Sequence, residues 1–301
     1  MSIPVVDFAA CSLRERDVAD GQMHHLREQL ESAFTKVGFV FLENTGITQE
    51  EVDRVMDVSK TFFLQPDEEK EPFSRKSFNS LHTVESSSSR GPEGKWPSGA
   101  GEGFQEIQTS FFQRCNQLSV RVLRVMALSL GLDPEVFLSA HRLIGAEGNS
   151  TTLRSLYYPS VDHDKVEEGQ LRCGEHSDYG SITLLFSSSG GLQVTLRSGE
   201  FIDVPSFPGA VLVNVADLMQ RWTGDHFVSV VHRVMLPPAG DSSTRQSLAF
   251  FVQPDDDAVI TCCDGSNKYP PSDGRLKYII ELYLCYSIIW SSRYMLVIEV
   301  V

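Results

Sequence analysis

Apolar and polar residues follow two different periods along the chain, and the change between them falls near residue 150. Before that point, apolar residues recur three and four positions apart, which is the spacing of one face of a helix. Helices are therefore expected over 21–37, 48–63 and 103–131, with another starting at residue 135. Short β-type runs are expected at 3–8 and 38–42.

The second half of the chain consists of short β-type runs that are separated by turns. These runs are TLRSLYY, SITLLF, GLQVTL, GAVLVNV, FVSVVHRVML and SLAFFV, all after residue 150. Strands at such regular spacing are typical of a sandwich or a barrel. The pattern therefore predicts an α+β protein in which a helical N-terminal half packs against a β-rich C-terminal half.

Two stretches fit neither pattern. Residues 71–106 contain four consecutive serines and several Gly and Pro residues, which indicates a long loop. Residues 278–301 are rich in Ile, Leu, Tyr and Val, but Glu281, Arg293 and Glu299 interrupt them. A membrane-spanning helix needs about 20 mostly uncharged apolar residues. We therefore expect a buried helix, a strand or an atypical tail here, and no membrane anchor.

Charge and cysteine content narrow the class of partner. The 301 residues carry a net charge of -14, and we find no cluster of Lys and Arg. Such a chain repels phosphate backbones, so a nucleic-acid partner is not expected. The six cysteines form no C-x-x-C pair, and the N-terminus does not read as a secretory signal. We expect a cytoplasmic protein with reduced thiols that acts on a small molecule, and the sequence does not indicate its oligomeric state.

The strongest chemical signal is His176 followed two residues later by Asp178, with His232 in a separate β-type run. Residues two apart on a strand project from the same face. Two imidazoles and one carboxylate on one side of a metal leave three positions open, as in the facial triad of non-haem Fe(II) oxygenases. By itself, an H-x-D pair is more often an ordinary hydrogen-bonded pair. Other residues of the chain are therefore needed to distinguish a metal site from such a pair.

Arg245 and Ser247 supply that context, because they also share a face and lie in the β-type run after His232. A guanidinium can bind a carboxylate through two parallel hydrogen bonds, and a serine hydroxyl can add another. A dicarboxylic keto acid needs such a clamp at one end while its keto-acid end chelates the metal. A surface salt bridge is the alternative role for Arg245.

The chain resembles the isopenicillin N synthase-like family of Fe(II)/2-oxoglutarate-dependent dioxygenases. The matching stretches, in family order, are IPVVDF, GFVFLENTGI, FFLQPDEEK, LRSLYYP, GEHSDYGSITLLF, GGLQV, VPSFPGAVLVNVADLMQRWTGDHFVSVVHRV and RQSLAFFVQP. The resemblance implies a double-stranded β-helix (jelly roll) with N-terminal helices packed around it. It divides the chain into an N-terminal region at 1–145, a jelly-roll domain at 150–271 and an atypical tail at 272–301.

The resemblance also implies residue roles and an activity. The implied iron ligands are His176, Asp178 and His232, and the implied 2-oxoglutarate ligands are Arg245, Ser247 and Tyr158. Fe(II) would act with 2-oxoglutarate and O2 as cosubstrates, and ascorbate is a candidate reductant. The expected reaction is oxidation, by default hydroxylation, of a small organic substrate, with release of succinate and CO2. Two alternatives stay open: a 2-oxoglutarate-independent iron oxidase of the same family, and a catalytically impaired binding protein.

Four residues near these motifs are given structural roles from the sequence. Asn214 and Asp217 in the NVAD segment are interpreted as residues of an Asx-type turn, which is a sufficient reason for both. Phe207 and Trp222 are expected in the core because of their size and apolar character.

For Arg154 and Leu156, a place beside the substrate pocket and a plain strand role are equally open. The remaining histidines have no triad-like neighbours, and we expect them on the surface or in loops. They are His24, His25, His82, His141, His163 and His226.

Overall fold

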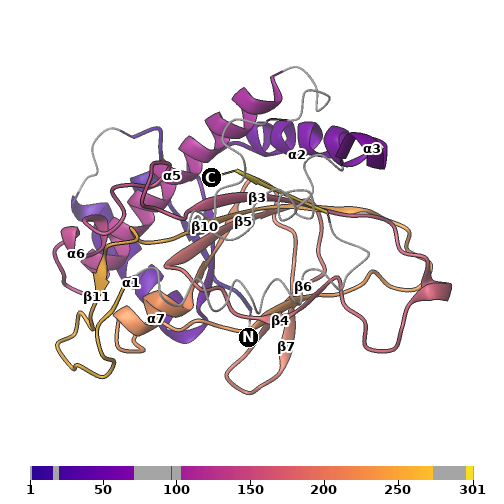
Figure 1. Ribbon diagram of the computed structural model, residues 1–301. Helices are drawn as coiled ribbons and strands as arrows, with labels where there is room; N and C mark the ends of the chain where they lie inside the picture. Colours follow the sequence, from indigo (N-terminus) through magenta and orange to yellow (C-terminus); the bar gives the residue numbers. More distant parts are fainter. Residues whose placement is uncertain (1, 16–19, 71–95, 97–102, 274–295, 301) are drawn as a thin grey trace, which may run out of the picture.

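Two β-sheets face each other, and a layer of helices covers the outer face of the larger one (Figure 1). The computed structural model describes residues 2–15, 20–70, 96, 103–273 and 296–300. The arrangement is that of a double-stranded β-helix with helices packed around it, so the fold predicted from the sequence is confirmed.

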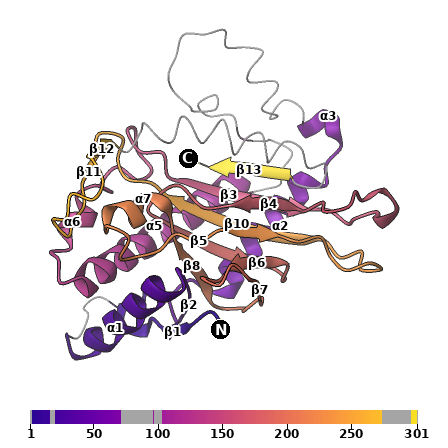
Figure 2. The same ribbon diagram turned by 90° about the horizontal axis from the view of Figure 1, so that it is seen from below.

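The larger sheet has seven strands. In spatial order they are β1 (Val5–Asp7), β2 (Phe39–Glu43), β8 (Val211–Val215), β5 (Ile182–Ser187), β10 (Arg245–Val252), β3 (Thr152–Tyr158) and β13 (Leu296–Val300). All neighbours are antiparallel except β1 and β2, which run parallel. Figure 2 shows these strands side by side. The smaller sheet has four strands: β4 (Cys173–His176), β9 (His232–Val234), β6 (Leu192–Thr195) and β7 (Phe201–Val204). A separate pair is formed by β11 (Val259–Ile260) and β12 (Ser272–Asp273).

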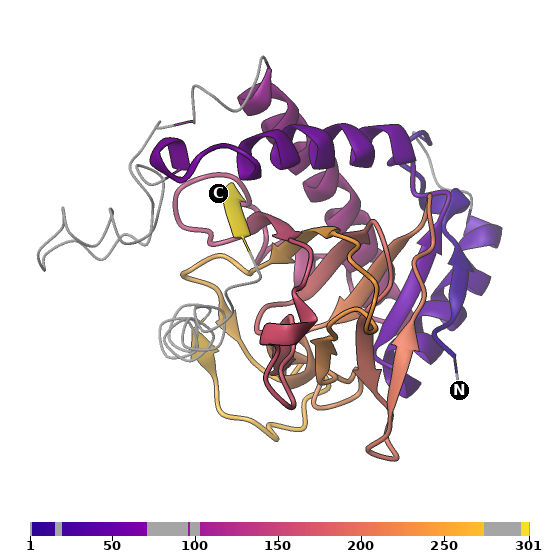
Figure 3. The ribbon, with the colours of Figure 1, turned by 90° about the vertical axis from the view of Figure 1, so that its right-hand side faces the viewer.

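Helices α2 (Gln49–Phe63) and α5 (Phe104–Ser129) lie on the side of the large sheet that faces away from the small sheet, and Figure 3 shows α2 crossing above the strands. The other helices are α1 (Asp20–Lys36), α3 (Asp67–Lys70), α6 (Glu135–Leu138) and α7 (Asp217–Trp222). Helix α2 begins with a capping box, in which Thr48 Oγ1 accepts from the Glu51 N–H and Glu51 Oε2 accepts from the Thr48 N–H. The T-x-x-E spacing in the sequence is the signal for this start.

Strand alternation sorts the side chains of β10 between the two faces of the sheet. Phe250 lies on the outer face, where its ring centroid is 5.0 Å from that of Phe112 in α5. Arg245, Ser247 and Phe251 lie on the inner face, which we define as the face turned toward the small sheet. A second hydrophobic core fills the space between the sheets, and its buried members include Tyr158, Leu192, Val194, Leu212 and Val234.

Two expectations about local structure are wrong. The run FVSVVHRVML is not one strand, since only His232–Val234 joins a sheet. The reason is that Phe227 is fully buried against Phe34 of α1 and donates its N–H to Thr223, so this part of the run packs on the helix layer. Phe207 is 38% exposed and packs edge-to-face on Phe41 at the border of the core, whereas Trp222 is buried as expected.

The sheet draws strands from all three stretches into which the sequence was divided. β1 and β2 come from the N-terminal stretch, and β13 from the tail pairs antiparallel with β3. The loop expected at 71–106 lies outside the described residues, apart from Trp96 and the start of α5. Within the described part of the chain, no helix is long and apolar enough to cross a membrane.

His141 is buried, contrary to the expectation of a surface or loop position. It is 4% exposed and its ring stacks on that of Trp222. Its Nδ1–H donates to the Phe137 carbonyl at 2.7 Å, which leaves Nε2 to accept from the Ser181 hydroxyl at 2.8 Å. Burial lowers the pKa of His141 to about 4. The neutral ring therefore ties α6 to the start of β5.

This histidine makes the stability of the fold depend on pH. Between pH 6.5 and about 4 the unfolded chain binds a proton at His141 that the folded chain does not, so the free energy of unfolding falls as the pH falls. The full shift corresponds to about 3 kcal/mol. Urea denaturation of the metal-free protein across this range measures the effect. His141→Gln should be less stable at pH 7, and its free energy of unfolding should depend less steeply on pH. If that free energy depends equally steeply on pH in both proteins, His141 is not the group responsible.

Candidate metal centre

Three side chains from two separate segments of the chain meet between the two sheets. His176, Asp178 and His232 each offer one ligand atom, and these atoms all lie within 4.8 Å of one another. The cause is the pairing of β4 with β9, which places His176 directly opposite His232. His232 Nε2 lies 3.7 Å from Asp178 Oδ1, and the two imidazole centroids are 4.3 Å apart.

Backbone carbonyls orient both imidazoles. His176 Nδ1–H donates to the Gly174 carbonyl at 2.8 Å, and His232 Nδ1–H donates to the Val230 carbonyl at 3.1 Å. A carbonyl can only accept, so each Nδ1 carries the proton and each Nε2 keeps its lone pair. Both rings are thus in the tautomer that binds a metal through Nε2.

Asp178 is held by two buried side chains from the large sheet. Its Oδ2 accepts from Thr183 Oγ1 at 2.6 Å and from Asn214 Nδ2 at 2.8 Å, which leaves Oδ1 for a metal. Thr183 and Asn214 face each other across β5 and β8. Although burial opposes its ionisation, the two histidines and these hydrogen bonds lower the pKa of Asp178, so it stays a carboxylate.

The interpretation of Asn214 and Asp217 as turn residues is therefore wrong. Asn214 donates its side-chain amide to a candidate metal ligand, as described above. Asp217 accepts a hydrogen bond from the Ser177 hydroxyl at 3.0 Å, and its N–H donates to the Asp178 carbonyl at 2.8 Å. Asp217 thus fixes the H-S-D segment against the start of α7, and Asn214 fixes Asp178 against β8. The sequence could not reveal this, because Asn214 lies 36 positions from Asp178.

The donor set fits Fe(II). It provides two imidazole nitrogens, one ionised carboxylate oxygen and hydrogen bonds that orient all three, and it leaves the other side of a metal open. A structural zinc site would instead close its coordination with a fourth ligand from the protein.

Removing the hydrogen bonds to Asp178 is expected to weaken metal binding without removing a ligand. Outer partners of metal ligands typically contribute about 10- to 100-fold, so Asn214→Ala and Thr183→Val should each reduce Fe(II) affinity by about that factor. Anaerobic Fe(II) titration with a competing chelator measures it. Thr61→Val, on the exposed side of α2, is the control. Unchanged affinity in both site variants would show that these contacts do not support the metal.

The predicted clamp lies at the far end of the inner face of the large sheet. Arg245 is 2% exposed, and its guanidinium donates to the hydroxyls of Ser247 (3.2 Å) and Ser187 (3.0 Å) and to the Gly190 carbonyl (3.0 Å). The guanidinium carbon lies 5.0 Å from the Tyr158 ring centroid, and Tyr158 pairs with Arg245 across β3 and β10. The three predicted residues are thus together, and Ser187 joins them without having been predicted.

Arg245 has no carboxylate partner among the described residues. Its hydrogen bonds go to neutral hydroxyl and carbonyl groups, although a buried charge is costly unless an opposite charge pairs with it. Burial lowers the pKa of Arg245, but a guanidinium stays charged at neutral pH. Arg245 therefore offers an unpaired positive charge to an anion.

A second buried arginine, Arg172, lies behind Tyr158. It is 4% exposed, and its guanidinium carbon lies 5.7 Å from the Tyr158 ring centroid. It donates to the carbonyls of Pro159 and Ser243, so it ties the end of β3 to the segment before β10. Burial raises the pKa of Tyr158, so its hydroxyl keeps its proton and can donate a hydrogen bond. No sequence motif singled out Arg172.

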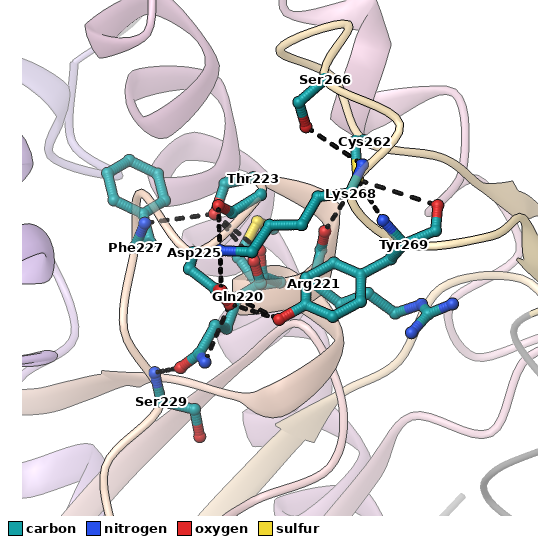
Figure 4. Close-up of polar contacts among 12 residues, drawn as sticks. Gln220, Arg221, Thr223, Asp225, Phe227, Ser229, Cys262, Ser266, Lys268 and Tyr269 are labelled. Atoms are coloured by element: carbon teal, nitrogen blue, oxygen red, sulfur yellow. Dashed lines mark hydrogen bonds and ion pairs between the residues drawn. The ribbon is translucent and has the colours of Figure 1, made fainter.

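The segment that leads into β9 is held by Lys268 and Tyr269 (Figure 4). Lys268 forms an ion pair with Asp225, and the Tyr269 hydroxyl donates to the same carboxylate at 2.9 Å. Gln220 of α7 donates to Asp225 at 3.0 Å and accepts from the Ser229 N–H. These contacts fix both ends of the loop that carries the histidine of β9 to the metal centre.

Comparison with known proteins agrees with this geometry. Residues 149–254 match the family model of the 2OG-Fe(II) oxygenase superfamily, and residues 3–98 match that of the non-haem dioxygenase N-terminal region, described from morphine synthesis. A 2-oxoglutarate-Fe(II) type oxidoreductase, ppzD of Metarhizium rileyi, is 31% identical over 84% of this chain and 80% of its own length. The 2-oxoglutarate-dependent dioxygenase gloF of Glarea lozoyensis is 28% identical over 92% of this chain and 97% of its own.

A solved structure covers nearly the whole chain. It is the crystal structure of a full-length Neurospora crassa protein in complex with alpha-KG and 5-formyluracil, and it superposes with a TM-score of 0.79 at 30% identity. The match covers 93% of this chain and 95% of the Neurospora chain.

Proposed function

The chain belongs to the 2-oxoglutarate- and Fe(II)-dependent oxygenases, and on that premise we propose that His176, Asp178 and His232 are its iron ligands. We propose in the same way that Arg245, Ser247 and Tyr158 bind 2-oxoglutarate. The observation that carries the proposal is the metal-ready triad on one side of the inner face, with a buried and unpaired guanidinium on the other.

The spacing along β10 supports this division of roles. Phe251 pairs with Thr183, which holds Asp178, and Ser247 lies four residues away on the same strand. At about 3.3 Å per residue the two positions are roughly 13 Å apart, which leaves room for a five-carbon diacid between the side chains. The diacid's distal carboxylate would neutralise Arg245, and the Ser247 and Tyr158 hydroxyls would donate to it.

When bound, Fe(II) and 2-oxoglutarate supply the activation of O2, with release of succinate and CO2. The protein supplies the geometry of the ligands, the charge that binds the cosubstrate and an apolar surrounding that excludes water. The function is thus oxidation of a small organic substrate, by default hydroxylation. The names of the relatives favour 2-oxoglutarate dependence over a cosubstrate-independent oxidase.

Further properties belong to the same proposal. We propose that the chain consists of three regions, 1–145, 150–271 and 272–301, each of which contributes strands to the large sheet. We also propose a cytoplasmic location and a small-molecule substrate without a nucleic-acid partner, which the acidic charge and the free cysteines among the described residues support. Ascorbate would serve as the reductant.

The test has two stages. Under anaerobic conditions, adding Fe(II) and 2-oxoglutarate should produce the visible charge-transfer band of an iron-bound 2-oxo acid. In air, a substrate should stimulate succinate release from 2-oxoglutarate. Thymine is the first compound to add, because the Neurospora crassa protein has been solved with it. A protein that binds neither Fe(II) nor 2-oxoglutarate would refute the proposal and favour an impaired binding protein.

A further inference from the structure

Two arginines contact the ring of Tyr158, and they come from opposite sheets. Arg245 belongs to β10 of the large sheet, whereas Arg172 directly precedes β4 of the small sheet and donates its backbone N–H to β9. Their guanidinium carbons lie 5.0 Å and 5.7 Å from the Tyr158 ring centroid, respectively. Arg172 is therefore a second cation at the end of the site where Arg245 would bind the distal carboxylate of 2-oxoglutarate.

The hydrogen bonds of Arg172 do not balance its charge. Its guanidinium donates to the carbonyls of Pro159 at 3.2 Å and Ser243 at 3.0 Å, and its buried Nε has no hydrogen-bond partner among the described residues. In the described part of the chain, no carboxylate forms an ion pair with Arg172. The carboxylate of Asp241 attracts Arg172 from a distance, but it is exposed, so water and salt screen this attraction.

The two buried cations repel each other. Burial and the charge of Arg245 both lower the pKa of Arg172, but a guanidinium keeps its proton at neutral pH. Arg172 is 4% exposed and Arg245 is 2% exposed, so solvent screens the repulsion only weakly. A ligand with a negative charge at this end of the site is attracted by both cations, whereas an uncharged end gains nothing from Arg172.

We propose that Arg172 is a specificity-determining residue of the cosubstrate site, because its charge favours 2-oxo acids that carry a second, distal carboxylate. Arg245 and Ser247 contact that carboxylate, and Arg172 attracts it through space from behind Tyr158. A unit charge that acts over roughly 10 Å at the effective dielectric constant of a protein changes an affinity by about tenfold. This inference rests on the proposed function, since it assumes that Arg245 binds 2-oxoglutarate.

Substitutions of Arg172 separate its charge from its hydrogen bonds. Arg172→Gln keeps N–H donors for the backbone carbonyls and loses the charge, whereas Arg172→Lys keeps both. The matched control is Arg221→Gln. Arg221 also lies against a tyrosine ring, at 4.8 Å from the Tyr269 centroid, and donates to the Pro270 carbonyl, but it belongs to α7 and not to the cosubstrate clamp.

Two probes report on the distal charge: 2-oxoglutarate, and 2-oxovalerate, which has the same five-carbon chain without the distal carboxylate. Their affinities for the full chain are measured from the charge-transfer band, with Fe(II) under anaerobic conditions. Arg172→Gln should weaken binding of 2-oxoglutarate by about tenfold and change that of 2-oxovalerate by less than about twofold. Arg172→Lys and Arg221→Gln should leave both affinities close to those of wild type.

Three results would overturn the role of Arg172. One is an unchanged affinity of Arg172→Gln for 2-oxoglutarate, which would show that the charge does not act on the cosubstrate. Another is an equal loss of affinity for the two 2-oxo acids, and the third is an equal loss in Arg172→Gln and Arg172→Lys. Either of these would show that the side chain only holds the structure. If wild type gives no band with either 2-oxo acid, the proposed function fails first and this inference fails with it.

Discussion

Asp178→Ala abolishes iron retention and lowers substrate-stimulated succinate release by more than about 100-fold. Loss of an outer hydrogen-bond partner already costs about 10- to 100-fold, and this change removes a ligand itself. It also leaves His176 and His232 without the carboxylate that balances the charge of the ion. Metal analysis after gel filtration and a succinate assay measure the two effects.

A folding defect has to be separated from a loss of metal. Asp203→Ala is the control, because Asp203 is exposed on β7 and accepts a hydrogen bond from Gln193 on the neighbouring strand. It should retain iron and turnover. His176→Ala should behave like Asp178→Ala. Normal succinate release from either ligand variant, with circular dichroism that matches wild type, would contradict the assignment of the iron ligands.

Arg245→Lys raises the 2-oxoglutarate concentration needed for half-maximal rate by about 10- to 100-fold. Lysine keeps the charge but loses the planar fork that donates to Ser247 and Ser187 while it binds a carboxylate. Hydrogen bonds to charged groups contribute about 1.5–3 kcal/mol each, which corresponds to this range. Iron binding should stay unchanged, since Arg245 lies at the other end of the inner face.

The measurement is the apparent affinity for 2-oxoglutarate, from the charge-transfer band under anaerobic conditions and from succinate release in air. Arg233→Lys is the control, because Arg233 lies on the small sheet and pairs with Glu175. The same apparent affinity in Arg245→Lys as in wild type would show that another group binds the distal carboxylate. A parallel loss of iron would show that the change disturbs the whole site.

The layout of the fold follows closely from local patterns. Helical periodicity located α1, α2 and α5, and the T-x-x-E spacing located the start of α2. Alternation located β3, β5 and β10, and the same period placed Arg245 with Ser247 on one face. These features depend on residues a few positions apart, so the sequence contains all that is needed to predict them. The expectation that His176 and Asp178 share a strand face is wrong, because β4 ends at His176 and Asp178 lies beyond it.

The errors concern residues whose surroundings come from distant segments. His141 was expected near solvent, yet α6 buries it against Ser181 and Trp222. Asn214 was given a turn role, yet it supports Asp178. A polar residue can satisfy the same hydrogen bonds locally or across the fold, and no local pattern distinguishes the two cases.

The amino-acid pattern alone predicts the fold class, the candidate metal ligands and the candidate cosubstrate clamp, since side-chain chemistry and a period of two are properties of the chain. Only folding shows which imidazole nitrogens are left to bind a metal and which buried amide and hydroxyl hold Asp178. Those facts depend on strand register between β4 and β9 and between β5 and β8. Register is set by packing among strands that lie far apart in the sequence, and it is therefore visible only after folding.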